Sequence, residues 1–308
     1  MAKLKVFLAA MAVVGTMASA NLAKAATAKC GFNGDYSFFF WDPEAPVSGV
    51  GFVGVKLDPK TKCRSGIVLP GGILNCNIFD GGIYEDFIED GSVFLESDGE
   101  GTMEIETNSS RGICGLGVNA LELDISVVLG GKSVLFNSDG EEFAGSGLIP
   151  QAGYVATFTG RADKCFAGQI SGCYDARFWT SDIPLVGDCT ICVNGAGAVT
   201  GGSCRCHTGA EFVLNESVPS GASFEYLSEI EAGGYTLGEN CQSSTGYLWF
   251  VTSSDEICGL SSFMALDFGV AQQGKEIIGA CDTSPFILNN SSELNAGIVS
   301  CAFEGWLQ

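Results

Sequence analysis

The amino-acid sequence predicts an all-β protein made of two tandem, duplicated antiparallel β-domains that disulfide bonds stabilise. Three observations predict this fold class: apolar and polar residues alternate along the chain, a set of motifs recurs in the same order, and all 14 cysteines lie beyond residue 28. The alternation has the period of two that belongs to a half-buried strand. An up-and-down barrel and a two-sheet sandwich both satisfy this pattern.

The first 20 residues have the parts of a secretory signal peptide. Lys3 and Lys5 give a positive start, residues 6–14 are apolar, and residues 18–20 are small enough for cleavage. Later triplets of small residues place the cut as late as residue 28. The apolar stretch is shorter than the roughly 20 residues that cross a bilayer. We therefore expect a cleaved signal and a secreted bacterial protein, periplasmic or extracellular.

The first copy, residues 30–168, contains short strands separated by turns. Alternating or β-favouring runs predict strands at 36–41, 51–57, 73–79, 93–97, 103–106, 121–126, 134–136 and 154–159. Asp-Gly pairs between these runs predict hairpin turns, because such pairs tolerate the positive φ that tight turns need. These pairs begin at Asp80, Asp90, Asp98 and Asp139.

The second copy, residues 169–308, repeats the motifs of the first in the same order. The matched motifs are Gly34-x-Tyr36 with Gly172-x-Tyr174, Phe40-Trp41 with Phe178-Trp179, Ile113-Cys114-Gly115-Leu116 with Ile257-Cys258-Gly259-Leu260, Ala120-Leu121-Glu122 with Ala265-Leu266-Asp267, and Gly131-Lys132 with Gly274-Lys275. Several ordered matches indicate duplication of one unit. The second copy is slightly longer between Trp179 and Cys258, which predicts a cysteine-rich insertion around residues 189–207.

Residues 34–107 resemble a β-repeat domain that is common in bacterial secreted proteins. The resemblance lies in Gly34-x-Tyr36-x-Phe38, Gly91-x-Val93 and Asp98-Gly99-x-Gly101, which follow the G-x-Y-x-F, G-x-h and D-G-x-G patterns of that family, where h is apolar. The resemblance implies an exported β-domain and assigns no chemistry. The dense cysteines depart from the family pattern.

The charge and histidine content exclude several classes of function. The chain has 15 Lys and Arg against 36 Asp and Glu, a formal charge of −21. Such a polyanion is repelled by nucleic-acid phosphates and by anionic lipid, so we expect neither partner. A single histidine excludes a multi-histidine metal site.

Eight cysteines form two equivalent sets of four and are the disulfide candidates, since thiols oxidise in exported proteins. Four cysteines allow three connectivities in each copy. In a closed barrel the first and last strands are neighbours, which favours Cys30–Cys165 and Cys173–Cys301 and leaves Cys63–Cys114 and Cys206–Cys258.

The segment from Cys189 to His207 offers a metal-binding alternative. Cys189, Cys192, Cys204 and either Cys206 or His207 have the spacing of a tetrahedral zinc site. Export favours the other interpretation, in which these cysteines form disulfides. A redox-active Cys189–Cys192 pair lacks the surrounding pattern of a thioredoxin-like fold.

The remaining features predict no defined chemistry. Acidic clusters at residues 85–90, 98–100 and 139–142 suggest solvated turns, with calcium as an unsupported alternative and a carboxylate-based hydrolase as a further one. The aromatic stretches at 38–41 and 178–179 place one face in a core and the other in a hydrophobic cup or a contact between copies. We expect a non-enzymatic binding or structural module without a cofactor. Its expected partner is a small apolar ligand in a barrel mouth, a protein along the acidic surface, or a second copy of the chain.

Overall fold

The computed structural model describes most of the chain beyond residue 29. The described residues are 30–42, 47–78, 82–110, 112–115, 117–138, 141–143, 154–156, 158–166, 168–180, 185–209, 223–238, 246–253, 263–281 and 301–308. The predicted signal peptide, residues 1–20, lies outside them.

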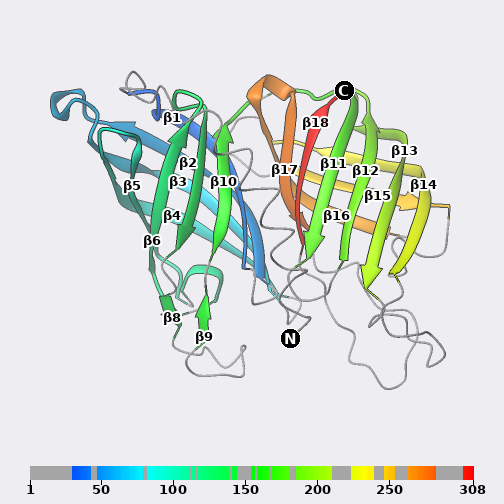
Figure 1. The fold of residues 1–308 in the computed structure, drawn as a ribbon, viewed down its shortest axis with the longest axis horizontal. Coiled ribbons are helices and arrows are strands. Elements are labelled where there is room, and N and C mark those ends of the chain that lie inside the picture. Colours follow the sequence, from blue (N-terminus) through cyan, green and yellow to red (C-terminus); the bar gives the residue numbers. More distant parts are fainter. Residues whose placement is uncertain are drawn as a thin grey trace.

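The first barrel is a closed antiparallel sheet of eight strands in up-and-down order (Figure 1). Its wall consists of β1 (Gly34–Trp41), β2 (Val47–Leu57), β3 (Ser65–Ile78), β4 (Gly82–Leu95), β5 (Glu100–Thr107), β6 (Ala120–Val128), β7 (Ser133–Ser138) and β10 (Thr159–Lys164). The wall closes where β10 pairs with β1. A separate hairpin of β8 (Glu141–Phe143) and β9 (Tyr154–Ala156) lies between β7 and β10 in the chain.

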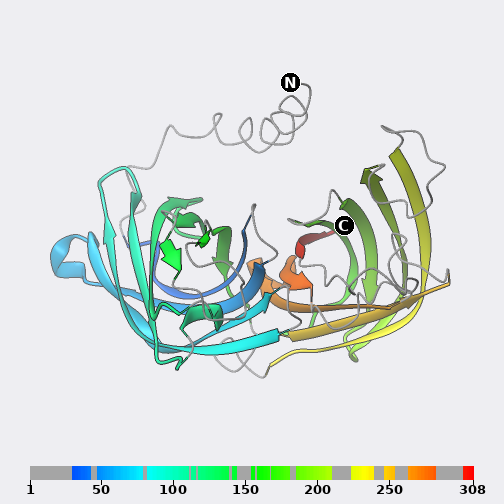
Figure 2. The same cartoon turned by 90° about the horizontal axis from the view of Figure 1, so that it is seen from below.

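The second barrel repeats this architecture and lies beside the first (Figures 1 and 2). Its strands are β11 (Gly172–Thr180), β12 (Leu185–Val193), β13 (Ala198–Gly209), β14 (Ser223–Thr236), β15 (Gly246–Thr252), β16 (Phe263–Ala271), β17 (Glu276–Cys281) and β18 (Cys301–Leu307). The predicted all-β class with two tandem domains is confirmed, and both domains are closed barrels rather than sandwiches. None of the described residues belongs to a helix of the length and hydropathy that crossing a bilayer demands.

Alternating burial explains why these segments are strands. In β6, Leu121, Leu123 and Ile125 are buried while the intervening residues are exposed or half-buried. Their side chains fill the barrel core. Closure leaves no open sheet edge in either wall, which removes a common route to aggregation.

A matched tyrosine fastens the first strand of each barrel to a distant turn. Tyr36 Oη donates a hydrogen bond of 2.5 Å to the carbonyl oxygen of Gly131, and Tyr174 Oη donates one of 2.5 Å to that of Gly274. Both glycines belong to the Gly-Lys turns that the motif comparison paired. The same tyrosine-to-glycine hydrogen bond is therefore present in each barrel, in addition to the same topology, as expected for duplication of one unit.

Strand register matches the two barrels residue by residue. Phe40 and Phe178, each four residues after its tyrosine, lie opposite Gly49 and Gly187. A Cβ atom on either glycine would overlap the aromatic ring. The ring lies over its cross-strand neighbour in both copies, so that neighbour must be glycine.

The predicted turns are right in one place and wrong in another. Asp98 and Gly99 lie in the connection between β4 and β5, where Gly99 has a φ of 99°. Asp90 and Gly91 instead lie inside β4, where the register shifts at a β-bulge. The Asp90 carboxylate accepts a hydrogen bond from the Gly91 amide (2.8 Å), which stabilises the bulge locally. The pairs at 80–81 and 139–140 lie outside the described residues.

Disulfide bonds brace both barrels. The described pairs are Cys30–Cys63, Cys76–Cys114, Cys173–Cys192, Cys189–Cys204 and Cys281–Cys301. Cys165 and Cys206 are also disulfide-bonded. Cys258 lies outside the described residues, so the predicted Cys206–Cys258 bond stays a prediction.

The predicted pairing of Cys63 with Cys114 is wrong because successive connections of an up-and-down barrel alternate between its two ends. Cys63 lies in the β2–β3 connection, and Cys114 lies in the β5–β6 connection at the opposite end. Cys76, near the far end of β3, is within reach of Cys114 and bonds to it.

The predicted Cys173–Cys301 bond is wrong for the same reason. Cys173 is near the start of β11, whereas Cys301 pairs with Thr180 at the other end of that strand. The predicted Cys30–Cys165 bond is wrong although both residues lie at one end of the barrel. Cys165 forms a β-bridge with Ala271 of the second barrel, which takes it away from Cys30.

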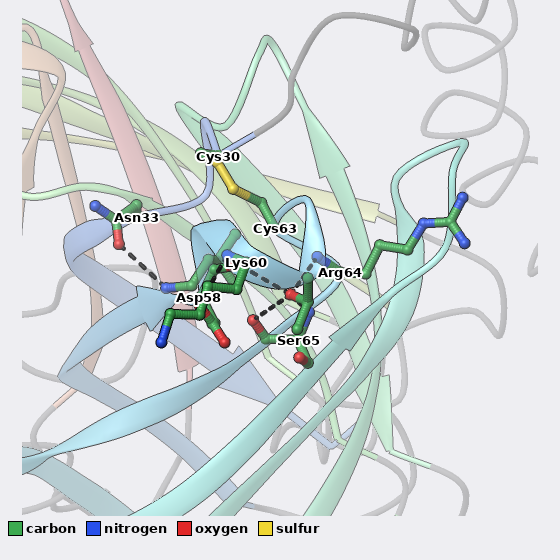
Figure 3. Close-up of a disulfide and its surroundings, with 9 residues drawn as sticks. Cys30, Asn33, Asp58, Lys60, Cys63, Arg64 and Ser65 are labelled. Carbon is green, nitrogen blue, oxygen red and sulfur yellow. Dashed lines mark hydrogen bonds between the residues drawn. A yellow bond between two sulfur atoms is a disulfide. The ribbon is translucent and has the colours of Figure 1, made fainter.

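Cys30 bonds instead to the turn between β2 and β3 (Figure 3). This turn contains the 3-10 helix η2 (Pro59–Thr61), whose N-cap Asp58 accepts a hydrogen bond from the Lys60 amide (2.8 Å). Asn33 Oδ1 accepts another from the Leu57 amide (3.2 Å). The disulfide and these bonds hold the segment before β1 across one end of the first barrel.

Candidate functional site

The cysteine-rich segment that the sequence suggested as an insertion forms parts of β12 and β13, two strands of the barrel wall. Cys189 bonds to Cys204 and Cys192 bonds to Cys173, and each pair joins directly opposed residues of neighbouring strands. Cys206 is disulfide-bonded too. The sulfur atoms that zinc would need as thiolates are therefore used as cross-links, so zinc ligation would require their reduction.

His207 and Cys206 are neighbours in β13, but their side chains point to opposite faces of the strand. Cys206 points into the core and is 1% exposed, whereas His207 is exposed on the outer wall. Successive side chains of a strand point to opposite faces, so these two residues do not share a site. Within the described ranges, no group of three or more His, Cys, Asp or Glu side chains is placed to hold a metal ion.

One of the acidic residues expected in a turn has a structural role in the first barrel. Asp86 lies on β4, is 4% exposed, and accepts a hydrogen bond of 2.7 Å from the backbone amide of Cys114. Cys114 has a φ of 53°, a conformation that few non-glycine residues adopt. Asp86 therefore positions the connection that carries the Cys76–Cys114 bond.

Other acidic residues gather on the outer wall of β4, β5 and β6. Asp90 lies opposite Glu106, and Glu104 lies opposite Glu122. Like charges directly opposite each other destabilise a sheet modestly. Asp90, which was expected in a turn, lies on β4, whereas the other three lie on strands as the alternation predicted. The side chains of residues 139–142 lie outside the described part.

The interior of the first barrel is filled by its own side chains. The cavity left among Phe38, Met103, Ile105 and their neighbours has a volume of ≈ 20 Å³. Such a space holds about one water molecule. Among the described residues this cavity is too small for a drug-sized ligand, and the apolar ligand in a barrel mouth stays a prediction.

The end of the second barrel has a recess of ≈ 400 Å³ between the 168–169 segment, the 195–197 turn and the end of β14. Tyr235 Oη, at its base, lies 2.9 Å from the carbonyl oxygen of Ile170 and 2.8 Å from that of Asn194. The corresponding end of the first barrel carries η2 and the Cys30–Cys63 disulfide. Five of the eight residues that line the recess are glycine or alanine, so few side chains are available to bind a ligand there.

Aromatic side chains join the two barrels. Phe39 and Trp41 point outward from β1 and pack with Trp179 of β11, and Ile278 and Ala302 complete the cluster. The rings of Trp41 and Trp179, at matched positions in the two copies, have centroids 5.0 Å apart at 80°. Of the two interpretations of the second aromatic face, the contact between copies is the one observed.

An ionic cluster lies at the same interface. Arg161 of β10 contacts Asp163 on its own strand (Nε–Oδ2, 2.7 Å) and two carboxylates of the second barrel, Glu276 (Nη2–Oε1, 3.0 Å) and Glu304 (Nη1–Oε2, 3.6 Å). Gln272 Nε2 donates to Glu276 Oε2 (2.8 Å). The side chains of Asp163 and Glu276 are fully buried.

Burial is the main cause of the raised pKa values of the three carboxylates in this cluster. Removal from water raises the pKa of Glu276 to about 7, with the charge of Asp163 adding to the rise and Arg161 opposing it. Burial also raises the pKa of Asp163 and of Glu304, again against the attraction of Arg161. Burial acts to lower the pKa of Arg161, but the three carboxylates outweigh it and raise that pKa. The arginine stays charged and the carboxylates hold protons unusually well.

Comparison with known proteins adds little to this geometry. No protein-family model matches the chain, and no curated protein matches it. Among solved structures, the chain is similar to one described as "Crystal structure of CghA with Sch210972", at 9% sequence identity and a TM-score of 0.28, with 89% of this chain and 88% of that chain covered. A likeness of this size carries no argument about function.

Sequence reasoning missed the ionic cluster entirely. Arg161, Glu276 and Glu304 are far apart in the chain and belong to no local motif. One signal was present: Arg161 and Asp163 share one face of β10, the face opposite to that of the buried Gly160 and Ala162. The partners were not predictable without knowing which outer faces of the barrels meet.

Proposed function

We propose that the protein is an exported, non-enzymatic module that acts as a rigid scaffold outside the cytoplasm. The observation that carries the proposal is the joining of two disulfide-braced barrels through a buried interface. Disulfides form and persist in oxidising compartments, and the N-terminal segment reads as a cleaved signal. The filled interior of the first barrel supports a role for the outer surface rather than for an enclosed ligand.

The outer wall of β4, β5 and β6 supports a cationic protein as the partner of this scaffold. Exposed carboxylates on these strands include Glu100, Glu106, Glu122 and Asp124. Steering by such a field raises association rates and weakens with ionic strength. A basic protein surface would relieve the repulsion between opposed carboxylates.

The scaffold role is tested by intact-mass and non-reducing peptide mass spectrometry of the native exported protein, together with metal analysis. We expect a processed N-terminus, fully oxidised cysteines and no stoichiometric metal. Zinc near one equivalent in the oxidised protein, or turnover on a glycan panel abolished by one Asp or Glu substitution, would replace the proposal with a metal-binding or hydrolase function.

The partner surface is tested with a cationic probe, poly-lysine, at several ionic strengths. We expect Glu122→Lys to weaken binding severalfold and to reduce its salt dependence. Glu231→Lys, which reverses an exposed charge on the second barrel, is the matched control and should have a smaller effect. Equal effects of the two variants would show that only net charge matters and would remove the assignment to this wall.

A further inference from the structure

The interface between the barrels buries more negative than positive charge. Arg161 is the cation that contacts all three carboxylates, and two of these, Asp163 and Glu276, have no exposed side-chain surface. Glu304, 20% exposed, also lies opposite Arg177 in the β11–β18 register. Arg177 is exposed and partly balances Glu304. One buried carboxylate is left without a matching positive charge.

Among the described residues, the charges that act on Glu276 are those of Asp163, Arg161 and Glu304. On β2, which also packs against the second barrel, the outward-facing buried residues Val50 and Phe52 do not titrate. On β1, the residues opposite Asp163 and Arg161 are Ser37 and Phe39, which do not titrate. Gln272, in the turn before β17, donates an amide hydrogen bond but carries no charge. On β16, Asp267 shares the interface face but lies opposite Ala280, four residues along the ladder from Glu276.

We propose that the packed interface holds a proton on this carboxylate cluster, centred on Glu276, and that loss of the proton as the pH rises weakens the packing of the two barrels. A buried carboxylate without a cationic partner is costly when ionised. Protonation of the carboxylate removes that cost while the barrels are packed. Separation of the barrels also removes the cost, because water then solvates the ionised carboxylate. The interface is thus a pH-dependent latch, a property beyond the proposed scaffold role.

The direction of the pH dependence follows from the raised pKa of Glu276. Its value of about 7 in the packed state exceeds the ordinary 4.5, so the packed state binds the proton more tightly than the open state. The resulting stabilisation is fully present below the ordinary pKa and is lost as the pH rises through the window between the two values. Asp163 and Glu304 shift in the same direction and reinforce the effect.

Each barrel is expected to stay folded while the interface opens. The hydrogen-bond ladder of each wall closes on itself, and each of the five described disulfides joins residues of one barrel. The segment between β10 and β11 stays with the second barrel: Cys165 bridges to Ala271, and the Phe166 amide donates to the Val270 carbonyl (2.9 Å). Cys165 is also disulfide-bonded, and the cysteines left for it, Cys206, Cys241 and Cys258, all belong to the second copy. The outer faces of the barrels thus separate about this segment while it remains attached. Opening therefore breaks far fewer bonds than unfolding.

Hydrogen exchange of the full chain tests the latch. Exchange of the Trp179 indole N–H, which is buried in the aromatic cluster between the barrels, reports on opening, and amides of β5, in the far wall of the first barrel, report on unfolding. After correction for intrinsic exchange, we expect the opening equilibrium at Trp179 to increase at least about tenfold from pH 5.5 to 8.5, because each unit of pKa difference is worth a factor of ten. The β5 amides should change much less.

The variant Glu276→Gln keeps the shape of the protonated side chain and cannot ionise. We expect it to abolish most of the pH dependence and to keep the interface protected at pH 8.5. Glu231→Gln, which removes an exposed carboxylate away from the interface, should behave as the wild type. A wild-type profile that is flat, or an unchanged profile in Glu276→Gln, would overturn the proposal.

A direct titration keeps the test decisive if the variant folds poorly. The ¹³C chemical shift of the Glu276 carboxyl in the labelled wild-type protein gives its protonation at each pH. An elevated midpoint together with coincident opening at the Trp179 indole supports the latch. A midpoint in the ordinary range for glutamate would refute it without reference to the scaffold role, which does not depend on pH.

Discussion

At the residue scale, two neighbouring glycines show how conformation and space act separately. Gly130 and Gly131 both have positive φ, 70° and 86°, in the turn between β6 and β7. A Cβ on Gly130 would meet no atom within 4 Å, whereas a Cβ on Gly131 would overlap the backbone of Gly31. Only Gly131 is fixed by both constraints, because the segment before β1 packs against it.

We predict that Gly131→Ala destabilises the first barrel far more than Gly130→Ala. The left-handed conformation costs an L-residue roughly 1–2 kcal/mol at either position. The overlap at Gly131 adds displacement of the N-terminal segment, for an expected total above about 3 kcal/mol. Urea unfolding of both variants measures the difference. Equal losses would show that the segment before β1 moves away freely.

The matched tyrosines give a second prediction. Tyr36→Phe and Tyr174→Phe each remove a buried hydroxyl that donates to a glycine carbonyl. An unsatisfied buried acceptor costs about 1–3 kcal/mol, and we expect a loss in that range from each variant. Thermal unfolding followed by barrel-specific hydrogen exchange should place each loss in its own barrel. A loss shared by both barrels would indicate that they unfold as one cooperative unit.

At the element scale, strand register extends the duplication to the cysteines. Cys76 pairs with Gly49 in the first barrel, and Cys206 pairs with Gly187 in the second. Since Gly49 and Gly187 are themselves equivalent, Cys206 occupies the position of Cys76. The repeated Ile-Cys-Gly-Leu motif makes Cys258 the counterpart of Cys114.

We therefore predict a Cys206–Cys258 disulfide that mirrors Cys76–Cys114. No Lys or Arg lies between the two cysteines, so trypsin is combined with a glutamyl endopeptidase. Non-reducing peptide mapping should then recover the segments that carry Cys206 and Cys258 as one cross-linked species. The Cys76–Cys114 species provides the internal control in the same digest. Recovery of Cys206 bonded to any other cysteine would show that the second barrel diverged after duplication.

The elements also show what the sequence reveals and what it hides. The strands at 36–41 and 121–126 were predicted because their alternation is local. The length of β3 and β4 was hidden by the bulge at Asp90-Gly91, which resembles a turn in sequence. Disulfide pairs failed where prediction treated the barrel as a ring of neighbours and ignored its two ends. Cys76, which was not among the predicted disulfide candidates, bonds to Cys114 because both lie at the same end of the barrel.

At the scale of the whole molecule, the interface depends on Arg161. It joins a strand of the first barrel to two strands of the second, and no local pattern identifies such a residue. Arg161 and Glu304 occupy matched positions in the two copies. Arg161 lies opposite Phe39 and Glu304 lies opposite Arg177, and Phe39 and Arg177 each come three residues after the matched tyrosine. Divergence at this one position after duplication thus gave both charges of the ion pair.

We predict that Arg161→Met destabilises the packed molecule more at pH 8 than at pH 5. Removing one partner of a buried ion pair typically costs about 3–5 kcal/mol. At low pH the carboxylates, whose pKa values are already raised, take up protons and lose most of that cost. Chemical denaturation at the two pH values measures the difference. A loss independent of pH would mean that Arg161 acts through packing alone.

The asymmetry of this interface limits how the chain assembles. One outer face of the first barrel meets a different outer face of the second, a head-to-tail arrangement that in principle continues from chain to chain into a fibre. Within the chain, Ser37 packs on Gly269. On the matched face of the second barrel, Arg177 stands where Phe39 stands on the first. A further copy would meet this charged side chain in place of the aromatic ring that packs between the barrels, so the contact is not repeated and growth beyond two units is disfavoured.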